Sequence, residues 1–325
     1  MNQIESKELF DKIFSGKMSE SEILEILISL HQKGETAEEI AGAMESMSSH
    51  SVKVLVDPEF RDKIVDNCGT GGDKSNSFNI STTTSFVLSG AGMSVAKHGN
   101  RSITSRSGSA DVLEKLGFNF NLSPMQHAVL LQNSGFTFMF AQNHHPAMKW
   151  VMPVRKSLPH RTIFNILGPL TNPAGVEKQL VGVFQKELLE PVGKALKLAG
   201  KKSGIVVSGD DGLDEVSISA NSQYFRFDKG EFGEIVPENY GLKRADISEI
   251  RGGDSDENAK ILLGILNGEI SGAKRDIALL NSAVALWSYR EARDIKEGLE
   301  MSRESIDSKK ALHHFNLSKE LSHTI

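Results

Sequence analysis

The stretch MSVAKHGNRSITSRSGSAD, residues 93–111, passes from a short apolar segment into a loop of small, hydroxyl and basic side chains. The apolar segment predicts a buried β-strand that ends near Lys97. In the loop, Lys97 and Arg101 supply positive charge, and Gly99 and Gly108 let backbone N–H groups approach a ligand. The alternative is a basic loop that only faces solvent. The number of donors favours a phosphate-binding loop instead.

A second glycine-rich loop lies upstream in DNCGTGGDKSNSFNIST, residues 66–82. Its glycines permit close backbone approach to a diphosphate, and residues 79–82 are expected to begin a helix whose N-terminus favours anions. The spacing matches neither the P-loop nor the dinucleotide-binding motif. Taken alone, the loop could equally be a glycine-rich turn before an ordinary helix cap. Asp73 would repel phosphates unless it meets a cation or a ribose hydroxyl.

Short apolar segments alternate with helical patterns from about residue 63 onward. This alternation predicts an α/β fold, with a large domain whose mostly parallel central sheet is flanked by helices. We expect strands at residues 63–67, 93–97, 136–141, 180–184 and 204–208, and a hairpin over residues 223–236. The loops that begin at Cys68, His98 and Gly209 each follow a strand. Because ligand crevices lie beyond the carboxyl ends of parallel strands, these loops should converge on one cleft.

The first sixty or so residues have the pattern of short amphipathic helices. Ser19 with Glu22, and Thr36 with Glu39, have the spacing of a capping box. We therefore predict a small all-helical N-terminal domain over residues 1–65, followed by the α/β domain over residues 66–325.

Composition argues against several classes of protein. The 325 residues contain no apolar run near the length that spans a bilayer, and the net charge of −5 gives no general attraction to nucleic acid. The N-terminus lacks the basic and apolar regions of a signal peptide, and one cysteine cannot form an intramolecular disulfide. We expect a cytoplasmic protein with neither membrane nor nucleic acid as a partner. Cys68 suits core packing better than nucleophilic chemistry.

The segment GDDGLDEVS, residues 209–217, places two adjacent carboxylates, Asp214 and Glu215, after a predicted strand. Without other information, a solvated acidic turn is the simpler interpretation. Opposite a diphosphate, however, such a pair suits Mg²⁺, a hard ion that prefers carboxylate, phosphate and water oxygens.

These three segments, together with HPAMKWVMPVRKSLPHRTIFNILGPLTNPA at residues 145–174, resemble in sequence and order the motifs of the anthranilate phosphoribosyltransferase family. That family joins anthranilate to phosphoribosyl pyrophosphate (PRPP) in tryptophan biosynthesis. The resemblance implies that the phosphoribosyl group of PRPP passes to the amine of anthranilate, giving N-(5-phosphoribosyl)anthranilate and pyrophosphate. It also implies Mg²⁺, with two ions expected beside PRPP.

The same resemblance implies a fold of the nucleoside phosphorylase/phosphoribosyltransferase type. In that fold, helices from the middle of the chain join the small helical domain, and the active site lies at the domain junction. A homodimer formed through the small domain is also implied.

The resemblance carries PRPP contacts onto both glycine-containing loops. The residues concerned are Gly69, Gly72, Asp73, Ser77, Asn79, Ile80, Ser81, Thr82, Lys97, His98, Gly99, Asn100, Arg101, Ser102, Ile103, Thr104, Ser105 and Ser109. It assigns anthranilate to Gly69, Asn100 and Arg155, and the metal to Ser81, Asp214 and Glu215. No residue is a certain catalyst, but transition-state support is expected from Lys97, Asn100 and Arg155.

Some positions depart from the family's pattern. Ser77 stands where the family usually has Thr, and Thr104 stands where it usually has Ser. Both residues keep the hydroxyl. His98 is open to two interpretations, as a general base or as a residue that orients the loop through hydrogen bonds.

The segment around Arg155 departs further from that pattern. Pro159 and His160 interrupt the usual Leu-Gly-x-Arg-Thr pattern, so Arg161 and Lys156 compete with Arg155 for the anthranilate carboxylate. From the residues alone, Arg155 could equally be a surface arginine.

Two other functions fit parts of the same pattern. A pyrimidine nucleoside phosphorylase has similar architecture, but the intact KHGN and RTIFNILGPLTNP segments argue against it. A nonenzymatic nucleic-acid-binding relative is disfavoured by the acidic net charge and by the presence of Asn100, Arg155, Asp214 and Glu215.

Overall fold

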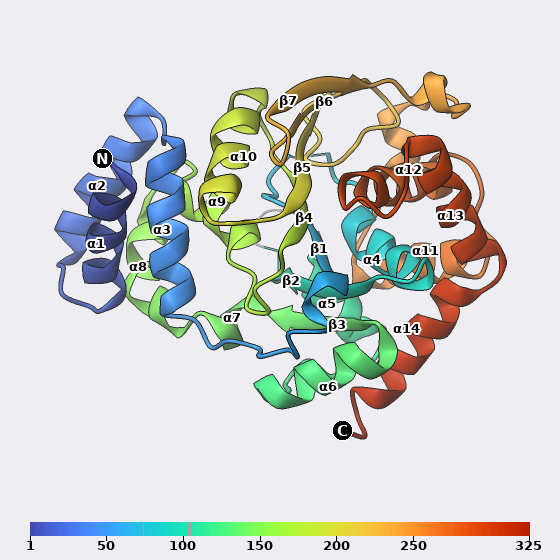
Figure 1. The fold of residues 1–325 in the computed structure, drawn as a ribbon, viewed down its shortest axis with the longest axis horizontal. Coiled ribbons are helices and arrows are strands. Elements are labelled where there is room, and N and C mark those ends of the chain that lie inside the picture. The colour runs from blue at the N-terminus through green and yellow to red at the C-terminus, as the bar shows by residue number, and fades with distance from the viewer. Residues whose placement is uncertain (74, 103–105) are drawn as a thin grey trace.

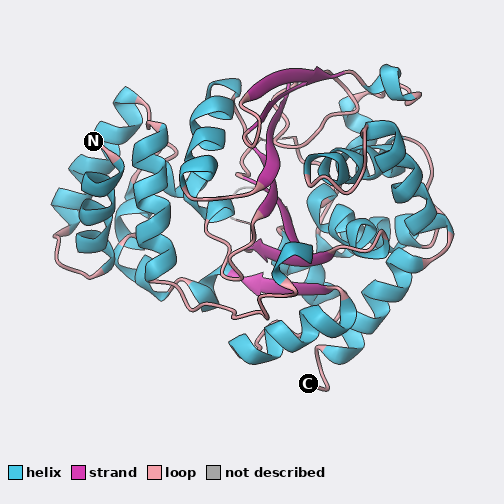
Figure 2. Ribbon diagram, in the orientation of Figure 1, coloured by secondary structure: helices cyan, strands magenta, loops and turns pink. Residues whose placement is uncertain are grey.

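A seven-stranded β-sheet forms the centre of the computed structural model, which describes residues 1–73, 75–102 and 106–325 (Figures 1 and 2). The strands are β1 (Ile64–Gly69), β2 (Ser94–Gly99), β3 (Phe136–Phe140), β4 (Lys178–Gly182), β5 (Ser203–Gly209), β6 (Ser222–Arg226) and β7 (Glu231–Ile235). Their order is β3-β2-β1-β4-β5-β6-β7. The pairs among β1 to β5 are parallel, and β6 and β7 continue the sheet antiparallel.

The five predicted strands and the predicted hairpin are confirmed, with ends that differ by at most two residues. β4 lies two residues earlier than predicted, and β1 and β2 run on to Gly69 and Gly99. Lys97 and His98 therefore belong to a strand and not to the loop that follows it. Pairing explains the extension, because Gly69 lies opposite Gly182 of β4 and Gly99 lies opposite Phe140 of β3.

Helices surround the sheet (Figure 2). The α-helices are α1 (Gln3–Phe14), α2 (Glu20–Lys33), α3 (Ala37–Ser49), α4 (Ile80–Gly90), α5 (Ser109–Lys115), α6 (Pro124–Ser134), α7 (Ala141–His144), α8 (Met152–Ser157), α9 (Ile163–Leu170), α10 (Leu189–Leu198), α11 (Ser255–Leu266), α12 (Ala273–Ser288), α13 (Ile295–Asp307) and α14 (Lys310–Leu321). Short 3₁₀ turns lie at Arg61–Lys63, Pro146–Trp150, Lys186–Leu188, Pro237–Tyr240 and Ile247–Ile250. None of the helices described here has the length and apolarity needed to cross a membrane.

Alternate residues of the parallel strands pack on opposite faces of the sheet, as strand geometry requires. Leu180 and Ile205 belong to the core that includes α4, α11, α12, α13 and α14, whereas Val181 and Val206 belong to the core that includes α1, α2, α3, α8, α9 and α10. Figure 1 shows these two groups of helices on opposite sides of the sheet. Both faces are therefore buried, and the sheet can present ligand groups only at its edges and strand ends.

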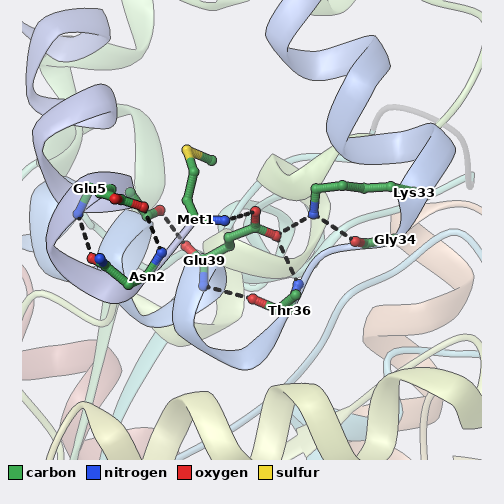
Figure 3. A network of polar contacts seen from close by, with 8 residues as sticks. Met1, Asn2, Glu5, Lys33, Gly34, Thr36 and Glu39 are labelled. Carbon is green, nitrogen blue, oxygen red and sulfur yellow. Dashed lines mark hydrogen bonds and ion pairs between the residues drawn. The ribbon is translucent and has the colours of Figure 1, made fainter.

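Helices α1, α2 and α3 form the start of the chain, and a buried carboxylate joins them. The Glu39 side chain is fully buried and accepts hydrogen bonds from the Met1 ammonium, the Lys33 ammonium and the Thr36 backbone N–H (Figure 3). Thr36 in turn accepts from the Glu39 N–H, so the predicted capping box is confirmed. One side chain thus links the start of α1, the end of α2 and the start of α3.

Two mid-chain helices, α8 and α9, pack against the helical bundle formed by α1, α2 and α3. Val154 of α8 and Phe164 of α9 share one apolar cluster with Phe10 and Phe14 of α1 and with Ile40 of α3. The Phe164 ring packs edge-on against both phenylalanines of α1, at 6.0 and 6.1 Å between ring centroids. The segment that carries Arg155 is therefore packed between the helical bundle and the sheet.

Tyr289, which directly follows α12, ties the centre of the sheet together. Its side chain is fully buried, its hydroxyl donates to the Asp66 carbonyl at 2.7 Å, and it accepts from the Leu180 N–H at 3.2 Å. One hydroxyl therefore satisfies backbone groups of both β1 and β4.

We expect Tyr289→Phe to lower the free energy of unfolding by about 1–3 kcal/mol, because a buried carbonyl and a buried N–H lose their shared partner. Urea denaturation measures this change. Tyr224→Phe is the matched control, since Tyr224 is half-buried and its hydroxyl has no hydrogen-bond partner among the described residues. Equal stability of the Tyr289 variant and the wild type would contradict the stabilising role of the Tyr289 hydroxyl.

Candidate functional site

The carboxyl ends of β1, β2 and β5 lie at one edge of the sheet, and the loops that follow them meet there. The Gly71 N–H, after β1, donates to Asp214 Oδ2, after β5, at 2.6 Å. Asn79 Nδ2 donates to the Ser107 carbonyl at 3.3 Å, and the hydroxyls of Thr82 and Ser109 lie 3.0 Å apart. The three loops thus meet at this end of the sheet, as predicted.

The glycine loop takes its shape from residues without side chains. A Cβ atom on Gly69 would lie 2.2 Å from Asp214 Oδ2, and one on Gly182 would lie 1.6 Å from the Asp214 carbonyl oxygen. Gly71 and Gly72 have φ angles of +71° and +77°, in the left-handed region that glycine adopts without strain. The acidic turn can therefore pack directly against the ends of β1 and β4.

Asp214 and Glu215 are buried, with 8% and 9% of their surface exposed, so the solvated-turn interpretation is wrong. Burial, followed by the charge of Asp73, raises the pKa of Asp214 to about 7. Burial, followed by the charge of Asp214, raises the pKa of Glu215 to about 8. Neither carboxylate forms an ion pair with another described residue. Two buried carboxylates whose ionisation is opposed by burial and by neighbouring carboxylates fit a bound divalent cation.

Ser81 and Lys97 lie beside this pair. Lys97 is only 1% exposed, and its ammonium donates to the Asn67 carbonyl at 2.8 Å and to Ser81 Oγ at 3.2 Å. Its charge favours ionisation of both Asp66 and Glu215. Ser81 Oγ, Asp214 and Glu215 are the predicted metal ligands, and within the described ranges no group of three or more His, Cys, Asp or Glu side chains is arranged around a common metal position.

The remaining residues of the glycine loop and the start of α4 differ in exposure. Asp73, Ser77 and Asn79 are half-buried, whereas Ile80 and Thr82 are buried in the helix. Asn79 Oδ1 accepts from Asn258 Nδ2 at 2.9 Å, so α11 fixes the orientation of this amide.

The basic loop after β2 is organised by a carboxylate that sequence reasoning did not single out. Asp111 Oδ2 accepts from the N–H groups of Ser102 and Gly108, at 3.1 and 2.8 Å. Arg101 donates to Asp111 and Glu114, so its guanidinium binds α5 and its charge is already compensated. The available signal for Asp111 was its place three residues after Gly108, where the N3 residue of a helix can bind the cap backbone. Ile103, Thr104 and Ser105 lie outside the described residues.

Asn100 is exposed at the start of this loop. Its Oδ1 accepts from the Arg101 N–H at 2.8 Å, and its Nδ2 has no acceptor in the described part of the chain. The amide is therefore oriented by the adjacent backbone, and its two Nδ2 donors are not used by any described residue.

His98 is held by the backbone of the 145–174 segment. The side chain is 4% exposed, its Nδ1 lies 3.0 Å from the Gly168 carbonyl, and burial with the neighbouring His145 places its pKa well below the usual value. A hydrogen bond to a carbonyl fixes Nδ1 as the protonated nitrogen. The His144 side chain instead contacts the Val52 carbonyl and the His127 ring. The consecutive residues His144 and His145 therefore point into different surroundings.

Arg155 and Arg161 occupy different environments. Arg155 is half-buried on α8, its guanidinium lies 5.8 Å from the Phe164 ring centroid, and it forms no ion pair with any described residue. Burial lowers its pKa. Arg161 instead donates to the Gly72 carbonyl and lies over the Phe184 ring. Lys156 is exposed.

Cys68 is buried in β1, and its thiol has a pKa well above the usual value because of burial and the charge of Asp66. A thiol that resists ionisation is a poor nucleophile. The packing interpretation is therefore favoured.

Comparison with known proteins identifies the relatives of this chain. Residues 61–312 match the a/b domain of a glycosyl transferase family, and residues 1–51 match the helical bundle domain of a glycosyl transferase family. The anthranilate phosphoribosyltransferase of Persephonella marina is 46% identical over 309 residues, which cover 94% of this chain and 91% of that protein.

Solved structures agree with the sequence comparison. The crystal structure of anthranilate phosphoribosyltransferase from Thermus thermophilus aligns with a TM-score of 0.95 at 35% identity, over 99% of this chain and 96% of that one. The Saccharomyces cerevisiae enzyme in complex with PRPP and Mg aligns with a TM-score of 0.91 at 29% identity, over 100% and 94% of the two chains. The chain therefore belongs to the anthranilate phosphoribosyltransferase family.

Proposed function

We propose that the site described above carries out the family's reaction, in which the phosphoribosyl group of PRPP passes to the amine of anthranilate in L-tryptophan biosynthesis. The observation that carries the proposal is the contact between the glycine loop and the buried carboxylate pair, where Gly71 meets Asp214 at 2.6 Å. A diphosphate needs backbone donors and a hard cation together, and this contact brings the two kinds of group to one place. Binding of PRPP and Mg by the Saccharomyces cerevisiae relative supports it.

PRPP is proposed to lie between the glycine loop and the basic loop. The contacting residues are proposed to be Gly69, Gly72, Asp73, Ser77, Asn79, Ile80, Ser81, Thr82, Lys97, His98, Gly99, Asn100, Arg101, Ser102, Ile103, Thr104, Ser105 and Ser109. Burial of Ile80 and Thr82 limits both to backbone or indirect contact, and Arg101 acts through its backbone because its guanidinium binds α5.

Asp214, Glu215 and Ser81 are proposed to hold Mg²⁺, with two ions beside PRPP. When bound, Mg²⁺ neutralises the negative charge that develops on the leaving diphosphate. The residues themselves contribute oriented oxygens, and Lys97 adds a fixed positive charge next to Ser81. Such preorganised charge stabilises the transition state without reorganisation at the moment of reaction.

Anthranilate is proposed to contact Gly69, Asn100 and Arg155. Arg155 is a half-buried cation without an ion-pair partner in the described residues, so a ligand carboxylate can be gripped bidentately there. Asn100 adds the donors of its Nδ2, which no described residue accepts, from the loop after β2.

The chemistry needs no covalent intermediate with the protein. The amine nitrogen forms a bond to the anomeric carbon of the ribose while the bond from that carbon to the diphosphate oxygen breaks, and pyrophosphate leaves with the electron pair. The nitrogen then releases one proton, which an aniline-type amine loses readily. His98 is proposed to orient the loop, since its Nδ1 is already engaged by the Gly168 carbonyl.

We also propose that the chain forms a homodimer through its helical N-terminal domain, that this domain comprises residues 1–65 with mid-chain helices, and that the protein is cytoplasmic. Packing of α8 and α9 against α1 and α3 supports the contribution of the mid-chain helices.

The purified chain should consume anthranilate only when PRPP and a divalent metal are both present. Loss of anthranilate fluorescence measures the reaction, with omission of each component as the control. Turnover of a pyrimidine nucleoside with free phosphate, and none with PRPP, would replace this function with that of a phosphorylase.

The double variant Asp214→Asn/Glu215→Gln should lower turnover by roughly a hundredfold and raise the Mg²⁺ concentration for half-maximal activity, because the diphosphate loses its ordered cation support. Asp210→Asn is the matched control, since Asp210 lies exposed in the same turn and pairs with Lys186. An unchanged Mg²⁺ titration in the double variant would contradict the metal assignment.

Arg155→Ala should lower kcat/KM for anthranilate by roughly ten- to a hundredfold, which corresponds to the loss of about 1.5–3 kcal/mol from a charge-assisted hydrogen-bonded pair. PRPP binding should change little. Arg155→Lys should recover part of the loss, because an ammonium keeps the charge without the planar fork. Steady-state kinetics with each substrate varied in turn measure the effect, and exposed Lys156→Ala serves as the control.

A further inference from the structure

Arg161 lies where three segments of the site meet, yet the roles proposed above leave it without a function. Its Nη2 donates to the Gly72 carbonyl in the glycine loop, and its guanidinium carbon lies 3.4 Å from the Phe184 ring centroid, just after β4. A Cβ atom on Gly72 would lie 2.7 Å from Nη2, so the absence of a side chain at residue 72 makes room for this contact. The guanidinium is thus held by a hydrogen bond on its edge and by a ring on its face.

The charge of this guanidinium faces two carboxylates of the site. Asp214 and Asp73 both favour the charged form of Arg161, against burial, which has the larger effect and lowers its pKa. The charge of Asp73 in turn opposes ionisation of Asp214. Arg161 is therefore placed to reduce the repulsion between the glycine loop and the acidic turn. The charge of Lys97 favours ionisation of the second carboxylate, Glu215.

The residue before Arg161 is held by the helical bundle. The ring of this residue, His160, stacks on His31 of α2, with centroids 3.9 Å apart and planes inclined by 10°. His160 Nδ1 also lies 2.9 Å from the Arg161 carbonyl oxygen. Pro159 and His160, which depart from the family pattern, thus lie where the helical bundle contacts the segment before Arg161. Arg161 in turn reaches the glycine loop.

The contacts of Arg161 also separate its role from that of Arg155. One edge of the Arg161 guanidinium is occupied by a backbone carbonyl and one face is covered by Phe184, whereas the Arg155 guanidinium donates to no described residue. More donors of Arg155 therefore remain for a ligand carboxylate.

We infer that Arg161 is a positioning residue for the diphosphate half of the reaction: it holds the glycine loop beside the acidic turn, so that the groups proposed to bind PRPP and its cation keep their relative positions. The inference rests on the proposed function, because it takes the diphosphate of PRPP as the ligand of these groups. It predicts a selective effect on PRPP and Mg²⁺ and little effect on anthranilate.

The test is Arg161→Gln, with PRPP binding measured by isothermal titration calorimetry at fixed Mg²⁺ and without anthranilate. Loss of a charge-assisted hydrogen bond should raise the Kd for PRPP by roughly ten- to a hundredfold. The Mg²⁺ concentration for half-maximal activity should also rise, while KM for anthranilate stays within about twofold of wild type. Arg161→Lys should recover part of the PRPP affinity, since it keeps the charge but loses the planar fork.

Two further variants make the result specific. Phe184→Leu removes the supporting ring and leaves the guanidinium, so it should weaken PRPP binding in the same direction by a smaller factor. It also tests the inference if Arg161→Gln does not fold. Lys156→Gln removes an exposed cation from the same segment and should leave the Kd for PRPP unchanged.

Two outcomes would overturn the inference. One is a lower melting temperature of Arg161→Gln with an unchanged Kd for PRPP, which would mean a purely structural role. The other is a selective rise in KM for anthranilate, which would transfer the carboxylate contact from Arg155 to Arg161. Failure of the wild-type chain to bind PRPP would instead contradict the proposed function itself.

Discussion

The site depends on the close approach of the Asp214 turn to the ends of two neighbouring strands. Gly69 and Gly182 are register partners in β1 and β4, and each leaves out the side chain that would collide with Asp214. A methyl group at either position would fall within 2.2 Å of an Asp214 oxygen. This pair of glycines therefore allows an acidic turn to pack on the carboxyl edge of the sheet, within reach of the glycine loop.

Burial of that turn places carboxylates close together in the protein, which opposes their ionisation but suits the proposed cation site. Burial has the largest effect and opposes ionisation of both Asp214 and Glu215, the charge of Asp73 opposes it further, and Asp214 also opposes that of Glu215. The charge of Lys97 favours ionisation of Glu215, and that of Arg161 favours ionisation of Asp214. This excess of buried carboxylate fits the divalent cation proposed for the site, and a cation so held would attract a diphosphate.

The helical bundle contributes to the same site although it lies on the far side of α8 and α9. Phe10 and Phe14 of α1 hold Phe164, over which Arg155 lies, and His31 of α2 stacks on His160, next to Arg161. Arg155 and Arg161 belong to the same segment, but different helices of the bundle support them. Rearrangement of the bundle relative to the sheet would move both arginines together.

The sequence by itself determined the strands, the capping boxes of the first helices and the three loops that form the site, because these features follow from local periodicity, cap spacing and glycine content. Only the tertiary structure decided that Asp214 and Glu215 are buried, that the guanidinium of Arg101 turns to α5, and that Asp111, Asn258 and Arg161 organise the loops. The physical reason is that burial, and the partner that compensates a charge, depend on residues far apart in the chain. Asp214 meets Gly71 across 143 positions and Asn258 meets Asn79 across 179, separations at which no local pattern specifies a contact.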